Sequence, residues 1–531
     1  MRRIKACACL LALLIFAAAL GGCTATNEIP PAIILSDRMP PERGEAANKS
    51  SFEAELYFLS QDEKSLKVQK REVFYDTQTS RAEAALNALI AGPDVDRPDL
   101  KRSVSALSRL NRVELCGEVC NVYFEVDKFI PSATEWLKTR AAVAATVAAA
   151  EGVDTVNVYF YEQELGYLGY TLGSMSPLEE ELPIYLRNME RTYKALYKAE
   201  SGTAITEDTQ YVTQMATLYF ANAEGALLTA RNAEVSYPEG STKSEIAKLL
   251  IERLAGGDAQ GSLEPVLPVD FKLLSDPKVI YSGKTESGVE DTESDCIIEL
   301  VIEQPDAANY DEAIMCGALT LTITGFIPNV NGVRICIGEE AQPAAPVNQK
   351  DEEQAGGTAA ETENINILQT LGRDVLRRVD FTDQIGHEIT LYYPDADGAV
   401  LYGVKRIIPQ AAAYNPHARL QELLGGVADP GVAYPLFTAE DVKDVYLSGN
   451  VAVIDWAEGF AQKLRAFLDG DSSMAPSRRE SMFIYGVVNT LTDMPMISSV
   501  WMLENGEKLD TVGQIYLGNA LVRNPGLIVK E

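Results

Sequence analysis

The sequence predicts an α+β protein of three tandem small domains, each a mixed β-sheet covered by two helices. Three observations indicate this fold class. One order of expected elements, strand–strand–helix–strand–strand–helix–strand, occurs three times along the chain. The expected helices carry their apolar residues on one face, as helices that cover one side of a sheet do. The chain has 531 residues, too many for one core at about 150 residues per domain.

The repeat, together with the composition between its copies, divides the chain into seven segments. In chain order these are a signal peptide (1–22), a stalk (23–51), a first domain (52–175), a bridge (176–210), a second domain (211–340), a linker (341–384) and a third domain (385–531). The bridge has helical periodicity over residues 184–199. Residues 339–363 are rich in Ala, Pro, Gln, Gly and Glu, which is typical of flexible linkers.

The first segment has the pattern of an export signal. Arg2, Arg3 and Lys5 precede an apolar stretch over residues 6–20, which is too short to span ~30 Å of hydrocarbon comfortably. It ends in residues 20–22, Leu-Gly-Gly, followed by Cys23, and this tetrapeptide resembles the lipobox of bacterial lipoproteins. That resemblance implies diacylation of Cys23, and two acyl chains give stable anchoring. We therefore expect a lipid-anchored protein on the extracytoplasmic face of the cell membrane.

Each copy of the repeat opens with two extended segments. The first is a short aromatic strand, at residues 56–58, 218–220 and 391–393. The second lies at residues 73–75, 233–237 and 404–408. Aromatic and β-branched residues favour strands, and this composition predicts the extended conformation of both.

An amphipathic helix with clear boundaries follows in each copy. Ser80 with Glu83, and Thr242 with Glu245, have the spacing of a capping box. In the third copy Asn415 is a favoured cap and is followed by a proline. The three helices end at equivalent glycines, Gly92, Gly256 and Gly425.

The second half of each copy contains a hairpin, a second helix and a closing strand. The hairpins turn at residues 117–118 and 449–450, whereas the second copy has an acidic insertion at 283–295 before a strand at 296–302. The second helix is clearest at residues 134–150 and 478–492. The closing strands are expected at residues 152–156, 329–333 and 496–500.

Composition excludes some functions and weakens others. The formal net charge of -31 repels nucleic acid, so we expect no nucleic-acid partner. The two histidines, His387 at the start of a strand and His417 in the first turn of a helix, offer little for triads or transition metals. Cys116 and Cys120 flank a turn, so they could form a disulfide outside the cytoplasm or remain two buried free thiols.

Motifs for catalysis or cofactor binding are not found in the sequence. It has no Gly-x-Ser-x-Gly elbow, His-Glu-x-x-His helix or phosphate-binding loop. The acidic residues near 290–295 lack the spacing of a calcium loop, which favours a solvated loop. Asp127 and Asp455 are expected at equivalent places in different domains, where they cap a segment or face solvent. We predict no enzyme activity, no cofactor and no metal.

The helix ends, the hairpin and the closing strand together resemble the GerMN domain of Gram-positive sporulation and spore-germination lipoproteins. Residues 122–126 and 453–456 are similar to the family's strand motif. The resemblance implies a fold like the ring-building motif of extracytoplasmic assemblies. It also implies a non-catalytic scaffold whose partners are envelope or spore-assembly proteins, or further copies of the chain.

A different class of function stays open beside the scaffold. A lipid-anchored module that binds cell-wall glycan or a small solute would need an aromatic-lined cleft. The candidate aromatic residues for such a cleft are Tyr161, Tyr167, Tyr170, Trp456 and Trp501. Their gathering on one face would favour this alternative, and exposed sheet edges would favour the scaffold.

Overall fold

The structure is a computed structural model that describes residues 49–76, 79–126, 132–167, 171–179, 181–200, 211–283, 294–305, 310–338, 366–395, 398–426, 437–470 and 475–529. Small sheets and helices follow one another along these residues, which confirms the α+β fold class. The order strand–strand–helix–strand–strand–helix–strand runs three times, with a few short added elements. We call residues 49–160 the first unit, residues 211–337 the middle unit and residues 386–522 the last unit.

The first unit has two small sheets. Its elements are β1 (Lys49–Ser60), β2 (Leu66–Asp76), α2 (Arg81–Ala91), β3 (Leu100–Lys101), β4 (Ser108–Cys116), β5 (Val119–Val126), α3 (Ala133–Glu151) and β6 (Thr155–Phe160). The predicted stalk is three residues too long, because β1 already begins at Lys49. Ser80 caps α2 by accepting the Glu83 N–H at 3.0 Å. Strands β5 and β6 are parallel, and α3 supplies the crossover that a parallel pair requires.

The middle unit repeats this plan. Its elements are β7 (Tyr211–Ala221), β8 (Leu228–Pro238), α5 (Lys243–Ala255), β9 (Lys278–Tyr281), β10 (Cys296–Ile302), α6 (Glu312–Phe326) and β11 (Val330–Ile337). The capping box of Thr242 and Glu245 is confirmed. Residues 284–293 of the acidic insertion lie outside the described residues, and its ends meet where the Ser282 N–H donates to the Asp295 carbonyl at 2.8 Å. Helix α6 is buried on nearly all sides, so it has no polar face that would reveal its boundaries in the sequence.

Among its described residues, the last unit follows the same plan with two helices and two short strands added. Its elements are β13 (Gly386–Pro394), β14 (Leu401–Pro409), α7 (Gln410–Ala413), α8 (Pro416–Leu424), β15 (Val442–Ser448), β16 (Val451–Trp456), α9 (Phe460–Asp469), α10 (Pro476–Thr492), β17 (Ser499–Glu504), β18 (Glu507–Lys508) and β19 (Leu521–Val522). The sequence patterns above do not predict α9. Asn415 caps α8, as expected, by accepting the N–H groups of His417 and Ala418.

Two closing strands begin later than predicted. Strand β6 starts at Thr155 instead of residue 152, because Gly152 ends α3 in the left-handed conformation with φ 73°. Strand β17 starts at Ser499 instead of residue 496, because the Ile497 N–H closes a turn onto the Met494 carbonyl at 2.9 Å. In both units, therefore, the chain turns before it enters the sheet.

The segment after the middle unit corrects the predicted linker. Residues 339–365 lie outside the described residues, but residues 366–385, which we call the strap, are packed on the middle unit. The strap contains β12 (Asn366–Ile367), which pairs with β11, and two short 3-10 helices, η1 (Thr370–Gly372) and η2 (Arg378–Gln384). Its Leu376 and Phe381 are fully buried. The linker composition stops at residue 363, and the apolar residues after it can be buried.

The bridge between the first and middle units contains α4 (Leu182–Glu200), which confirms the helical periodicity expected there. Among the described residues, no helix is both long enough and apolar enough to cross a membrane. The predicted signal peptide, Cys23 and residues 24–48 of the predicted stalk lie outside the described residues.

One hydrogen bond recurs in all three units. A buried threonine of the second helix accepts the backbone N–H of a tyrosine in the first strand. The pairs are Thr146 with Tyr57 at 3.2 Å, Thr322 with Tyr219 at 3.3 Å, and Thr490 with Tyr392 at 3.0 Å. In each unit this bond ties the opening hairpin to the helix behind it, so the three units share one packing arrangement.

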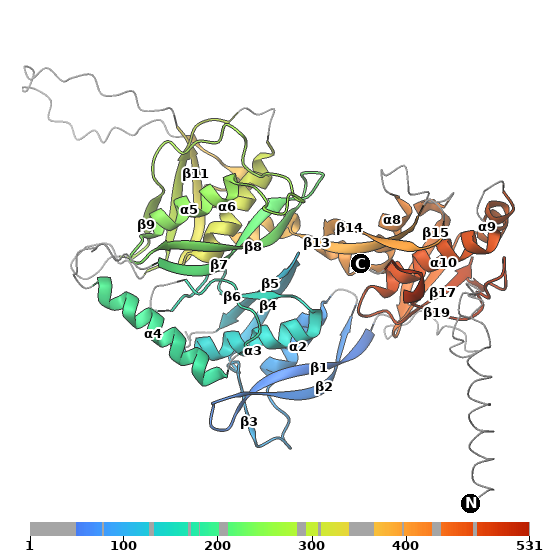
Figure 1. Ribbon diagram of the computed structural model, residues 1–531, viewed down its shortest axis with the longest axis horizontal. Helices are drawn as coiled ribbons and strands as arrows, with labels where there is room; N and C mark the ends of the chain where they lie inside the picture. The colour runs from blue at the N-terminus through green and yellow to red at the C-terminus, as the bar shows by residue number, and fades with distance from the viewer. Residues whose placement is uncertain are drawn as a thin grey trace, which may run out of the picture.

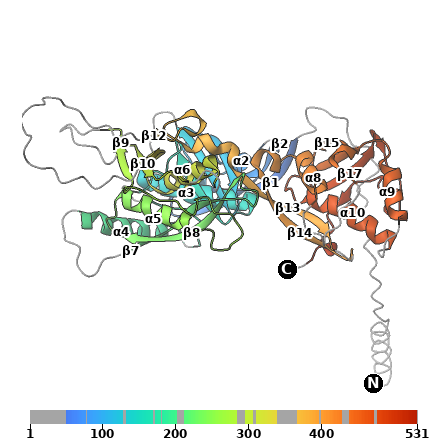
Figure 2. The same cartoon turned by 90° about the horizontal axis from the view of Figure 1, so that it is seen from above.

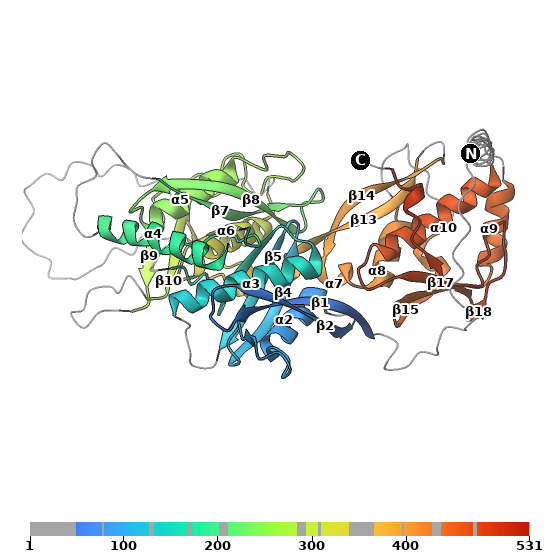
Figure 3. The same ribbon diagram turned by 60° about the horizontal axis from the view of Figure 1, so that its bottom comes forward.

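The three units contact one another. The first and middle units lie side by side, and the last unit lies to the right of both (Figure 1). Seen from above, the last unit again forms a separate lobe (Figure 2). The hairpin of β13 and β14 reaches from the last unit toward β4 and β8 (Figure 3). Buried apolar residues of all three units belong to one continuous cluster, so the units form a joined body.

Candidate functional site

A cavity of about 720 Å³ lies between the first and last units. Its volume is within the range of ~300–1,000 Å³ that is typical of ligand sites. Its walls come from the start of α2, from β4, from the strap, from the β14–α8 connection and from β15. The lining residues are Ser80, Glu83, residues 111–114, Thr382, Asp383, residues 409–411, residues 414–416 and residues 445–447.

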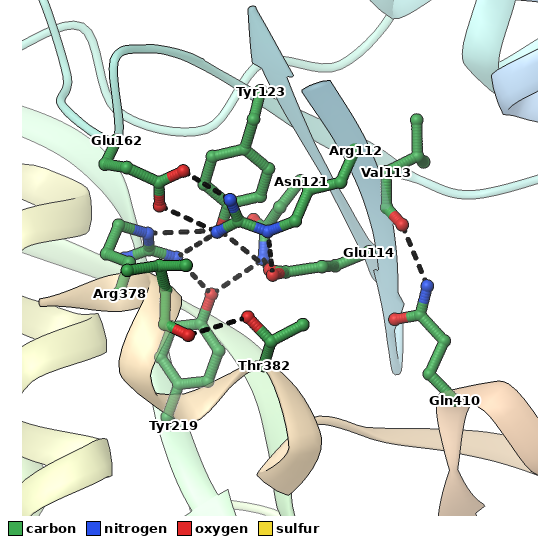
Figure 4. Close-up of polar contacts among 11 residues, drawn as sticks. Arg112, Val113, Glu114, Asn121, Tyr123, Glu162, Tyr219, Arg378, Thr382 and Gln410 are labelled. Atoms are coloured by element: carbon green, nitrogen blue, oxygen red, sulfur yellow. Dashed lines mark hydrogen bonds and ion pairs between the residues drawn. The ribbon is translucent and has the colours of Figure 1, made fainter. Parts of the chain in front are cut away.

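One wall is the edge of a sheet. Strand β4 is the outer strand in the order β4-β5-β6. A two-residue turn joins β4 to β5, and residues that flank such a turn hydrogen-bond to each other, so Val113 and Leu115 direct their backbone groups outward. Two side chains of the last unit contact this edge. Gln410 Nε2 donates to the Val113 carbonyl at 2.8 Å (Figure 4). His387 Nδ1 lies 3.3 Å from the Leu115 carbonyl.

The opposite wall is the corresponding edge in the last unit. Strand β15 is the outer strand in the order β15-β16-β17. The same two-residue spacing joins it to β16, with Ser448 opposite Val451. Because Ser448 faces its partner strand and alternate residues face opposite ways, Val445 and Leu447 direct their backbone groups to the outer edge. Both residues line the cavity, so edges of two different sheets open into it.

A buried ion cluster lies beside β4. Arg112 Nε donates to Glu114 at 2.7 Å, and the same guanidinium makes two hydrogen bonds to Glu162, one of them at 2.7 Å (Figure 4). Tyr123 donates its hydroxyl to Glu114 at 2.7 Å and lies under the Arg112 guanidinium at 3.6 Å. Burial opposes the charge of Arg112, but its bonds to Glu162 and the charge of Glu114 raise its pKa above the usual value. The charges of Arg112, Glu114 and Glu162 therefore largely compensate one another within the cluster.

A second arginine joins the first and middle units. Arg378 of the strap is 1% exposed. It donates to the Tyr123 hydroxyl at 3.1 Å and to the Tyr219 hydroxyl at 3.0 Å (Figure 4). It also donates to the Leu321 carbonyl at 2.5 Å. Burial opposes its charge, but Tyr123 and the neighbouring tyrosines raise its pKa well above the usual value, so it stays a cation. Arg378 therefore holds the strap against the first two units.

His387 and Tyr414 pack together at the junction of the first and last units. Their rings are stacked with centroids 5.6 Å apart. Burial, together with the charge of Arg419, lowers the pKa of His387 to about 4, so the ring is neutral at pH 7. The Tyr414 hydroxyl is buried and has no hydrogen-bond partner among the described residues, although the residue lines the cavity.

The disulfide alternative for Cys116 and Cys120 is wrong. Both cysteines are free and buried. Cys116 lies opposite Val119 and Cys120 opposite Leu115, which places the two side chains on opposite faces of the hairpin. Cys116 Sγ donates to the Leu228 carbonyl of the middle unit at 3.7 Å, and burial raises the pKa of this thiol to about 12. The free-thiol alternative is therefore the correct one.

Asp455, another polar residue considered from the sequence, has a structural role. Asp455 accepts the Gly506 N–H at 2.6 Å and pairs with Lys443 at 3.3 Å, so it holds a turn. Counted from the hairpin turn, Asp455 occupies the position of Tyr123, so its predicted equivalence to Asp127 is wrong. Asp127 itself lies outside the described residues. His417 lies in the first turn of α8, as expected.

The aromatic candidates that the structure describes do not gather into a cleft. Trp456, Trp501 and Tyr167 are buried, whereas Tyr161 is exposed. Trp456 packs with Phe437, Phe460 and Phe483, and Trp501 belongs to a separate apolar cluster. Tyr170 lies outside the described residues.

Sequence reasoning missed the polar residues around the cavity and the strap. Arg112 and Glu114 could have been found from the sequence. Charged residues two positions apart on a buried strand lie on one face of it, and buried charges are almost always paired. Arg378, Gln410 and His387 could not, because their partners are distant in the sequence.

Two stretches of the chain, residues 55–165 and 390–510, match the family model Germane, described as sporulation and spore germination. The two matched stretches together cover less than half of the chain. The first stretch contains β4 and the second contains β15, so both sheet edges that line the cavity lie in stretches that match this family model. The resemblance expected from the sequence is thus confirmed for these regions, and the chain is a sporulation- and germination-related protein.

Two solved structures are similar to this chain. The tandem GerMN domains of the sporulation protein GerM from Bacillus subtilis are 18% identical, with 55% of this chain and 93% of that chain covered and a TM-score of 0.20. A candidate lipoprotein from Clostridium perfringens is 19% identical, with 24% and 88% covered and a TM-score of 0.17. TM-scores this low carry no argument about how the units are arranged. No curated protein matches the chain.

Proposed function

We propose that this chain is a non-catalytic scaffold, lipid-anchored through Cys23 on the extracytoplasmic face of the cell membrane, that takes part in sporulation or germination envelope assembly. The description of the Germane family supports the process, and the lipobox-like residues 20–23 support the anchor. The partners would be envelope or spore-assembly proteins, with further copies of the chain as the other candidate.

The observation that carries this proposal is the pair of sheet edges, β4 and β15, that open into one cavity. Edge strands have outward N–H and C=O groups and pair readily with another polypeptide. The charged groups beside them are neutralised by each other, with Arg112 bonded to Glu114 and Glu162. This arrangement suits recognition of a polypeptide better than it suits acid–base chemistry.

The middle unit is, in this proposal, a divergent third copy of the domain. Its Thr322–Tyr219 hydrogen bond matches those of the other two units. It lacks the arginine that hydrogen-bonds to the end of the first helix in the other two units. In the first unit Arg71 donates to the Gly92 carbonyl at 2.9 Å, and in the last unit Arg406 donates to the Gly426 carbonyl at 2.5 Å. The hairpin register places Ala233 at this position in the middle unit.

The test uses the chain from residue 23 onward with Cys23→Ser. Light scattering with small-angle scattering would give its mass and shape, and defined multimers or one joined particle would support a scaffold. Complementation of a deletion strain with Cys23→Ala tests the anchor, and loss of envelope assembly with normal protein level is expected. Co-sedimentation with purified cell wall, without protein partners, would support the glycan-binding alternative and contradict the scaffold.

A further inference from the structure

We propose that helix α4, in the bridge between the first and middle units, rests its basic face on the anionic lipid surface to which the chain is tethered. This inference rests on the proposed anchor at Cys23 and names the part of the molecule that the anchor brings to the membrane. The packing of α4, the charge along it and the length of the stalk each support it.

The apolar face of α4 is packed on the rest of the molecule. Leu182 is 3% exposed, and Tyr185, Leu186 and Met189 are partly buried against the continuous apolar cluster. The helix contacts α3 and lies at the outside of the first and middle units (Figure 1). An amphipathic helix that packs by its apolar face presents its opposite face to solvent. The polar face of α4 therefore points away from the molecule.

This outward face is basic. Arg187 and Arg191 are exposed, and neither has an ion-pair partner among the described residues. The sequence continues the series with lysines at positions 194 and 198, and residues spaced by four, three and four positions share one face of an α-helix. Residues 182–199 include four basic residues and one acidic residue, Glu190, in a chain whose formal net charge is -31. Positive charge is thus concentrated on one helix of an acidic protein.

Anionic phospholipid headgroups complement a helix face of this kind. Lysine and arginine side chains near an anionic lipid surface are attracted to it, and the attraction acts over a Debye length of about 8 Å. The acidic surface elsewhere on the chain is largely screened beyond that distance. Ile184, three residues before Arg187, is 41% exposed and adds an apolar contact, which is typical of helices that lie in a membrane interface.

The stalk is long enough to allow this contact and short enough to favour it. Residues 24–48 separate Cys23 from β1, and a chain of that length spans at most about 90 Å when fully extended. Strand β1 contacts α3, and α3 contacts α4. The tether therefore keeps the helix close to the membrane, so that even a weak surface contact is populated.

The experiment uses the chain from residue 23 onward with Cys23→Ser, so that no acyl chain contributes to binding. Sedimentation measures binding to vesicles of phosphatidylcholine alone and to vesicles that also contain phosphatidylglycerol, each at low and at high salt. We expect binding to the phosphatidylglycerol vesicles alone, and high salt should abolish it because the contact is electrostatic.

Charge variants locate the contact on α4. Arg187→Gln combined with Arg191→Gln should weaken binding to the phosphatidylglycerol vesicles by about tenfold or more. Both side chains are exposed, so the fold should be retained. The matched control is Arg465→Gln combined with Arg478→Gln, which removes the same charge from exposed positions of the last unit and should leave binding nearly unchanged.

Three results would overturn the proposal. They are equal binding to the two kinds of vesicle, equal effects of the two double variants, and tighter binding to inorganic polyphosphate than to the phosphatidylglycerol vesicles, which would mean that a soluble polyanion is the occupant. The test of the anchor with Cys23→Ala does not use α4. A failure here with loss of envelope assembly there would reject the lipid-facing helix and keep the anchored scaffold.

Discussion

His387 of the last unit places its Nδ1 3.3 Å from the backbone carbonyl of Leu115 in the first unit. The two residues are 272 positions apart in the chain. The contact lies beside the cavity and covers one end of the β4 edge. Because the imidazole is a titratable group held between two units, the junction should respond to pH.

We expect acidification to loosen this junction. Burial, with a contribution from Arg419, lowers the pKa of His387 from 6.5 to about 4. A lowered folded-state pKa means that the stability contribution is complete above pH 6.5 and is lost as the pH falls toward 4. The free energy of unfolding should fall by up to about 3 kcal/mol over this pH range. The protection factors of the β4 amides, corrected for the intrinsic exchange rate at each pH, should therefore fall between pH 6.5 and 4 in the unmodified chain.

His387→Phe should remove that part of the pH dependence, and His417→Phe, at the other histidine, should not. An unchanged pH profile in His387→Phe would show that other groups loosen the junction.

Glu151 should produce a pH dependence of opposite sign. Burial raises its pKa from 4.5 to about 6, although its carboxylate accepts the Ala82 N–H at 2.7 Å. A raised folded-state pKa means that the stability contribution is complete below pH 4.5 and is lost as the pH rises through 6. Glu151→Gln should recover about 2 kcal/mol at pH 7 relative to the unmodified chain. Chemical denaturation at pH 4.5 and pH 7 measures this, with the exposed Asp154→Asn as control.

Thr490→Val should destabilise the last unit by about 1–3 kcal/mol, because the buried N–H of Tyr392 would lose its acceptor. Thr490→Ser keeps the hydroxyl and should cost less. Exchange of the Tyr392 amide and urea unfolding of the last unit give the two readouts. Equal stability of the two variants would mean that the recurring hydrogen bond contributes nothing.

Arg378→Met should release the strap from the first and middle units. The Leu321 carbonyl would lose its donor, and the contacts to Tyr123 and Tyr219 would disappear. The expected cost is on the order of 2–4 kcal/mol. Limited proteolysis within residues 366–385 should become faster. The neighbouring Arg377 is exposed, so Arg377→Met serves as the matched control, and equal cleavage of the two variants would contradict the assigned role.

Much of each unit was readable from local patterns. Ser80, Thr242 and Asn415 were identified as caps because a capping side chain bonds to N–H groups within three residues of itself. The hairpins at residues 117–118 and 449–450 were found for the same reason, since turn chemistry acts over two residues. The start of β6 was misplaced because Gly152 was assigned to the strand instead of to the helix end.

The repeated order of elements, the helix caps and the α+β class can be read from the sequence, because they depend on residues close together in the chain. The tertiary structure alone decided where the strap packs, which face each of Cys116 and Cys120 takes, and which sheet edges meet at the cavity. Arg378 illustrates the reason, since its partners Tyr123 and Tyr219 are 255 and 159 residues away. Contacts at that separation form only when whole units pack against each other, and no periodicity or motif near residue 378 records them.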